Sequence, residues 1–155
     1  MRRIRSGREL PDSAESPQAG RRSVRRRKGY WIATTVVVAE SLAGGAMDLF
    51  RFHPYVSVLT GLGYPAYFAT ILGSAKLLAA GALLAPGYPR LKEWAYAGVV
   101  FNMGGAAISQ LAAGNTWVDA VVPTGFLAVT IASWALRPSG RRLEAVPVHP
   151  PPQPR

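Results

Sequence analysis

The chain has 155 residues, of which 49% are hydrophobic, and it carries a formal net charge of +10. Residues 1–29 hold ten of the 18 Lys and Arg residues, so most of the excess charge lies outside the hydrophobic body. The chain contains no cysteine, which excludes disulfides, zinc–thiolate sites, iron–sulfur clusters and a cysteine nucleophile.

The first segment, residues 1–29, is rich in Arg, Ser, Gly and Pro and has almost no large apolar side chains. This composition predicts a disordered basic tail. Its run from Arg21 to Lys28 directly precedes an apolar stretch, which favours orientation in a membrane and attraction to anionic lipid. We expect no nucleic acid among the partners, because no base-reading or stacking module accompanies the charge.

Four apolar runs follow, each of the length that a helix needs to cross a hydrocarbon core of about 30 Å. A soluble bundle would show a polar face at every turn, and these runs do not. A cleaved signal peptide is an alternative for the first run, but its length and the central Glu40 argue against it. The sequence predicts an all-α integral membrane four-helix bundle in residues 30–137, with spans at residues 30–50, 67–85, 94–113 and 118–136.

Basic residues near the span ends predict the orientation of the bundle. They precede the first span, lie between the second and third, and follow the fourth, namely at Arg21–Lys28, Arg90, Lys92, Arg137, Arg141 and Arg142. The other two loops contain only Arg51. By the positive-inside rule both termini lie in the cytoplasm, including a proline-rich tail at residues 138–155 that is also predicted to be disordered.

The loop between the first two spans, residues 51–65, is apolar enough to predict a short interfacial segment lying on the bundle. It contains His53, one of only two histidines, and a metal site needs several clustered ligands. The spans contain no histidine for axial ligation of a haem, and the chain shows no Ser-His-Asp set or phosphate-binding glycine loop. We therefore expect no metal, no catalytic residue and no intrinsic cofactor.

Three polar side chains are predicted to share one depth near the bilayer midplane. Glu40 lies ten residues from the cytoplasmic end of the first span, and Lys76 lies nine residues from that of the antiparallel second span. At a rise of about 1.5 Å per residue they reach nearly the same depth, and Asn102 in the third span adds a polar group there. Because a lone charge at this depth costs about 2.5–3.5 kcal/mol on insertion scales, we expect Glu40 and Lys76 to form a buried pair.

The sequence leaves two roles open for the cluster of Glu40, Lys76 and Asn102. It is either a clasp that fixes the register of neighbouring helices or the lining of a cavity for a proton, an ion or a small ligand. Near the outer span ends, a polar mouth is a further hypothesis, and its members are Asp48, Ser109, Gln110 and Asp119. Small residues at four-residue spacing, such as Ala75 and Ala79, predict close helix packing within the bundle or in a homo-oligomer.

Residues 62–114 contain several short motifs in a fixed order: Gly-Tyr-Pro at 63–65, the intramembrane Lys76, a Pro-Gly turn at 86–87 and "LKEWAYAG" at 91–98. In these motifs the chain resembles the DoxX-like family of small four-helix bacterial membrane proteins. The resemblance covers residues 30–137 and implies a multi-pass protein of the bacterial inner (plasma) membrane. It also implies an accessory or quinone-proximal subunit of a membrane redox system, without a cofactor of its own and more a partner of an oxidoreductase than an enzyme.

Two other function classes remain as alternatives. One is a small transporter or channel-like protein that uses Glu40, Lys76 and Asn102 as its pathway. The other is a membrane scaffold that anchors a soluble partner through its basic cytoplasmic face.

Overall fold

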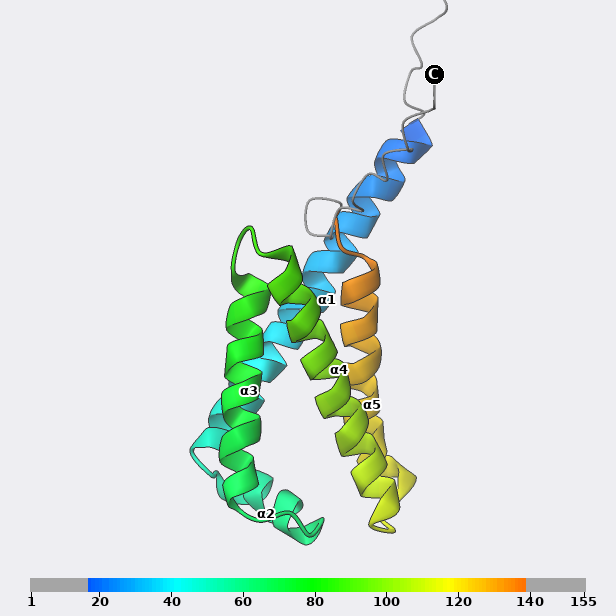
Figure 1. Ribbon diagram of the computed structural model, residues 1–155. Coiled ribbons are helices and arrows are strands. Elements are labelled where there is room, and N and C mark those ends of the chain that lie inside the picture. The colour runs from blue at the N-terminus through cyan, green and yellow to red at the C-terminus, as the bar shows by residue number, and fades with distance from the viewer. Residues whose placement is uncertain (1–16, 139–155) are drawn as a thin grey trace, which may run out of the picture.

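The computed structural model describes residues 17–138, which fold into helices with no strand among them (Figure 1). The predicted all-α class is confirmed. The predicted unstructured segments at residues 1–16 and 139–155 lie outside the described residues. The helices are α1 (Pro17–Leu49), α2 (His53–Gly61), α3 (Tyr67–Leu84), α4 (Pro89–Ala112) and α5 (Trp117–Ala135).

Four long helices form a ring in which α1 packs against α3 and α5, and α4 packs against the same two helices. The chain runs up and down through them, so α1 begins and α5 ends at the same end of the bundle (Figure 1). We call this the basic end, after Arg26, Lys92 and Arg137. The opposite end, where α2 connects α1 to α3, is the α2 end.

Helix α1 begins at Pro17, well before the first predicted span. Residues 17–29, which the sequence predicted as part of a disordered tail, are therefore helical. Arginine, lysine, alanine and glutamine are all good helix formers, and the rigid span that follows supplies the nucleus on which the basic segment extends as a helix. The arginines of this segment are exposed and pack into no hydrophobic core. The apolar pattern that identified the spans therefore could not reveal this extension of the helix.

Helix α2 occupies the loop for which a short interfacial segment was predicted. It begins with Pro54 in its first turn, where a missing N–H is tolerated, and none of its residues is buried. Its side chains therefore cover the α2 end of the bundle instead of building its core.

Helix α4 differs most from a typical membrane span. By length and apolar composition three of the described helices qualify as spans, namely Gly20–Leu49, Tyr67–Leu84 and Trp117–Ala135. Helix α4 has 24 residues, so it is long enough, but Asn102, Ser109, Gln110 and several glycines dilute its apolar character. It ends in a Schellman motif, in which Gly114 has φ 76° and the N–H of Asn115 donates to the carbonyl of Gln110.

Large apolar side chains cover the outside of the bundle. The exposed fractions are 67% for Ile32 on α1, 75% for Leu78 on α3, and 79% for Phe101 on α4. A water-soluble monomer rarely exposes contiguous apolar patches of this kind, whereas lipid chains solvate them. The inside is lined by smaller apolar residues and by Tyr96 and Met103.

Helices α1 and α3 approach each other closely at two glycines. A Cβ atom at Gly73 would lie 2.6 Å from the carbonyl oxygen of Gly45 and 2.6 Å from the backbone nitrogen of Leu49. Only glycine fits at such a backbone contact, which is the usual role of small residues between membrane helices. The pair Gly45 and Gly73 therefore sets the distance between the two helices that carry Glu40 and Lys76.

We predict that Gly73→Ala separates α1 from α3 and destabilises the protein by about 1–3 kcal/mol, the usual range for overpacking. The measurement is the apparent melting temperature in detergent micelles. Gly81→Ala is the matched control, because Gly81 lies on the same helix and a Cβ there meets nothing within 4 Å. Equal melting temperatures for the two variants would contradict the close contact.

Candidate functional site

An ion bridge between α1 and α3 is the central polar feature of the bundle. The Nζ atom of Lys76 lies 3.3 Å from Oε1 of Glu40 and 3.1 Å from Oδ2 of Asp48. The side chains are 13% exposed for Lys76 and Glu40 and 5% exposed for Asp48. The expected pair of Glu40 and Lys76 is therefore present in the structure, and a second carboxylate completes a three-membered bridge.

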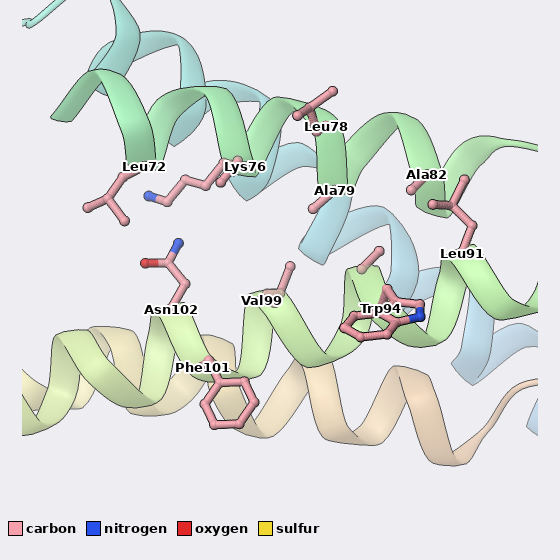
Figure 2. Close-up of a pocket in the computed structure, with 13 residues that line it drawn as sticks. Leu72, Lys76, Leu78, Ala79, Ala82, Leu91, Trp94, Val99, Phe101 and Asn102 are labelled. Carbon is pink, nitrogen blue, oxygen red and sulfur yellow. The ribbon is translucent and has the colours of Figure 1, made fainter. Parts of the chain in front are cut away.

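The direction of the lysine side chain explains why it reaches Asp48. Side chains on a helix lean toward its N-terminus, and the N-terminus of α3 lies at the α2 end. The Lys76 side chain extends in this direction, toward Leu72 (Figure 2). Glu40 and Asp48 are eight residues apart on α1, slightly more than two turns, so one face of α1 presents both carboxylates to α3.

Asp48, predicted as a member of the outer polar mouth, also belongs to this bridge. The sequence placed it by the depth of its backbone alone, and the long side chain of Lys76 spans the remaining distance. Gly44 provides the space for the bridge: a Cβ there would lie 2.9 Å from Oε1 of Glu40 and 3.1 Å from Nζ of Lys76. Sequence reasoning missed Gly44, because a glycine next to a glycine inside an apolar run carries no sign of a neighbouring charge.

Asn102 faces this bridge from α4. Its amide and the Lys76 ammonium point toward each other from opposite walls of a groove between α3 and α4 (Figure 2). The groove has a volume of about 560 Å³, and apart from Lys76 and Asn102 its lining is apolar or small, including Leu78, Leu91 and Trp94. The structure therefore brings all three residues of the predicted cluster together.

A second cavity of about 490 Å³ lies among the helices and shares Leu72, Lys76 and Asn102 with the groove. Glu40, Lys76 and Asn102 line it, together with Asp48 and Gln110. Residues of α2 and α5 complete its wall, so all five helices contribute. All three residues of the ion bridge thus line this cavity, and Lys76 also lines the groove.

Among the other residues of the predicted mouth, Gln110 shares one cavity with Asp48 and another with Ser109. The hydroxyl of Ser109 is hydrogen-bonded to that of Tyr64 at 2.8 Å. Asp119 accepts hydrogen bonds from the backbone and hydroxyl of Thr116 and caps the start of α5. Its role is local to that helix.

A cluster at the basic end was not predicted. Arg137, only 4% exposed, donates to Glu93 at 2.6 Å, and its guanidinium lies 5.2 Å from the ring centroids of both Tyr96 and Trp134. Trp134 also donates to Glu93 at 2.8 Å. The sequence identified Arg137 as an orienting charge, but no local signal links Glu93 to a residue 44 positions away.

Hydrogen bonds join three helices at the same end. The hydroxyl of Ser133 on α5 lies 2.8 Å from that of Thr34 on α1 and 2.8 Å from that of Tyr96 on α4. Arg26 donates to the carbonyl of Ala135 at 3.0 Å, where the last turn of α5 leaves carbonyls without helical partners. The basic end is therefore held by specific contacts, and the cavity lies toward the α2 end.

The chemistry available at the cavity is that of charge and hydrogen bonding. Within residues 17–138 no three His, Asp or Glu side chains are grouped so as to hold a metal ion. Lys76 and Asn102 supply hydrogen-bond donors, and Glu40 and Asp48 supply acceptors. These groups suit a proton or a small polar headgroup.

A family model described as the DoxX-like family matches residues 32–133. The chain belongs to the DoxX-like family. The matched region contains the whole ion bridge and Asn102. Membership of this family, together with three helices that are long and apolar enough to cross a bilayer, identifies this DoxX-like chain as a membrane protein. No curated protein and no solved structure matches the chain.

Removing the cation of the bridge should be strongly destabilising. Lys76→Met leaves two carboxylates buried without a cation, and breaking a buried ion pair costs about 3–5 kcal/mol. The triple variant Glu40→Gln/Lys76→Met/Asp48→Asn removes every charge and should recover most of the loss. Thermal unfolding in detergent measures both, and a single variant as stable as the wild type would show that the bridge contributes nothing.

The ion pair at the basic end predicts a pH dependence of stability. Burial alone would raise the pKa of Glu93, but hydrogen bonds from Arg137 and Trp134 and the charge of Arg137 hold it below its ordinary value of 4.5. The resulting stabilisation is present above that ordinary value and is lost as the pH falls through the lower, folded-state pKa. Glu93→Gln should therefore show a smaller drop in melting temperature between pH 7 and acidic pH, and an unchanged pH slope would argue against the pair.

Proposed function

We propose that this DoxX-like protein is an accessory subunit of a membrane redox system, without a cofactor of its own, and that it binds a quinone in the groove between α3 and α4. The observation that carries the proposal is the composition of that groove. Its walls are apolar, and Lys76 and Asn102 are its polar side chains.

The groove suits a ligand that arrives from the bilayer. Its wall residues Leu78, Trp94 and Phe101 are each at least three-quarters exposed on the outer surface of the bundle. A volume of about 560 Å³ falls within the range of about 300–1,000 Å³ typical of small-molecule sites. A hydrophobic tail can thus lie along the groove while a headgroup reaches its polar residues.

The two polar residues suit a quinone headgroup. A quinone ring carries two carbonyl oxygens, which accept hydrogen bonds and donate none. The Lys76 ammonium and the Asn102 amide are donors, and they face each other across the groove (Figure 2). Both carboxylates lie on the other side of Lys76, on α1.

The proposal includes four membrane spans, with α4 as the fourth, both termini in the cytoplasm, and the bacterial inner membrane as location. At 1.5 Å per residue, α4 is about 36 Å long and sufficient to cross the hydrocarbon core. Its outer face exposes Trp94, Phe101 and Ile108. Arg26, Lys92 and Arg137 lie at the end that the positive-inside rule assigns to the cytoplasm.

Quinone binding is measured by quenching of tryptophan fluorescence, because Trp94 lines the groove. We expect a short-chain quinone, titrated into the protein in lipid nanodiscs, to quench in a saturable manner. Asn102→Leu removes one hydrogen bond, of about 1–1.5 kcal/mol, and should weaken binding by roughly tenfold.

Two variants serve as controls for this titration. Trp94→Phe should lose most of the saturable quenching, while Ile32→Ala, on the exposed outer face of α1, should leave the affinity unchanged. Quenching that rises linearly with quinone and is equal in wild type and Trp94→Phe would report partitioning into lipid alone and would refute the site.

A further inference from the structure

The first turns of α1 carry a concentrated positive charge at the basic end. Figure 1 shows this part of α1 extending past the end of α5. Residues 20–28 are exposed, and no acidic side chain occurs among them. Their basic members are Arg21, Arg22, Arg25, Arg26, Arg27 and Lys28. The sequence predicted only a general attraction of this run to anionic lipid, and the structure adds a defined place where such a lipid can bind.

That place is a pocket between α1 and the end of α5. It has a volume of about 430 Å³. Arg26 and Arg27 line it from α1, and Arg137 lines it from the residues that follow α5. Apart from Ser23, the rest of its lining is apolar and consists of Val24, Leu136 and Pro138. The described lining therefore combines three cations with an apolar wall and contains no acid.

The three arginines of the pocket differ in how their charge is balanced. Arg137 pairs with Glu93 at 2.6 Å. Arg26 donates to the carbonyl of Ala135 at 3.0 Å, which orients its guanidinium, and a guanidinium has five N–H donors in all. Arg27 makes no hydrogen bond or ion pair to another residue of the described chain. The pocket thus has a net positive charge and spare donors at Arg26 and Arg27.

The depth of the pocket matches that of lipid phosphates. Trp31 on α1 is 43% exposed, and exposed tryptophans of membrane helices lie at the boundary between hydrocarbon and headgroups. Arg26 and Arg27 precede Trp31 by five and four residues, about 6–7.5 Å along the helix axis. The headgroup layer on each side of a bilayer is about 5–7.5 Å thick. This placement requires only that α1 crosses the membrane, and it holds for either orientation.

We propose that this pocket binds the phosphate of an anionic phospholipid. The guanidinium groups of Arg26 and Arg27 donate to the phosphate oxygens, a pairing that arginine can make through two parallel N–H bonds. Basic pockets beside membrane helices are known to bind anionic headgroups in this way. A bound lipid would connect the first turns of α1 to the end of α5.

The apolar wall favours a lipid over a soluble anion. Free phosphate needs only the charged side of the pocket. A phospholipid also places its glycerol and the first methylene groups of its acyl chains against Val24, Leu136 and Pro138. No aromatic residue is part of the described lining, so the pocket offers no surface on which a nucleic-acid base could stack.

Native mass spectrometry of the full chain, released from detergent micelles, measures the retained lipid directly. The probes are phosphatidylglycerol and phosphatidylcholine of equal chain length, because the second carries the same phosphate with a compensating positive charge. We expect preferential retention of one phosphatidylglycerol. Arg26→Gln/Arg27→Gln should weaken its binding by roughly thirtyfold, the effect of two basic side chains at the membrane surface. Arg27→Gln alone should weaken binding by roughly fivefold without touching the contact to Ala135.

Arg21→Gln/Arg22→Gln is the matched control. It removes the same charge from the same helix, but neither residue lines the pocket, so binding should change less than about threefold. Circular dichroism confirms that each variant is folded. Equal losses in the two double variants would show diffuse attraction and overturn the proposal, as would equal retention of the two lipids by the wild type. Displacement of the lipid by excess inorganic phosphate would assign the pocket to a soluble anion and also refute it.

The lipid pocket and the proposed quinone groove are tested independently. They share no lining residue. Failure of lipid retention therefore leaves the quinone titration unaffected, and failure of the quinone titration leaves lipid retention unaffected.

Discussion

Lys76 is a cation inside an apolar bundle, and the arrangement of α1 and α3 follows from the need to pair it. Its ammonium lies between Glu40 and Asp48, so one side chain links α3 to two turns of α1. The contact is possible because Gly45 and Gly73 let the helix backbones approach closely and Gly44 leaves room for the bridge itself. Charge pairing and small residues thus act on the same pair of helices.

Helix α4 lies on the other side of this pair. There Asn102 faces Lys76, and both side chains line the apolar groove and also the second cavity, to which Glu40 and Asp48 contribute. A ligand in the groove would contact the same lysine that pairs with the two carboxylates of α1. The basic end, held by Arg137 with Glu93 and by shared hydroxyl groups, provides a rigid base for both sites.

Much of the site could be predicted from the sequence, because a charge in a span of membrane length has few ways to be satisfied. Counting residues along two antiparallel spans was enough to pair Glu40 with Lys76. It could not assign Asp48 to the bridge, since backbone depth ignores the direction of a long side chain. It could not find the approach of Gly45 to Gly73 either, since helix rotation is set by packing. The helix before residue 30 was missed for a related reason: a basic segment without an apolar face carries no periodicity.

The central claim is that Lys76 contacts two carboxylates at once. Solid-state NMR of the protein in lipid bilayers, with ¹⁵N in the lysine ammonium groups and ¹³C in the carboxylates, measures this directly through dipolar couplings, and a Lys76→Met sample assigns the signals. The structure predicts that the Lys76 ammonium couples strongly to one glutamate and to one aspartate carboxyl carbon, and that both couplings disappear together in Lys76→Met. Coupling to the Glu40 carboxylate alone, or to neither, would contradict the account.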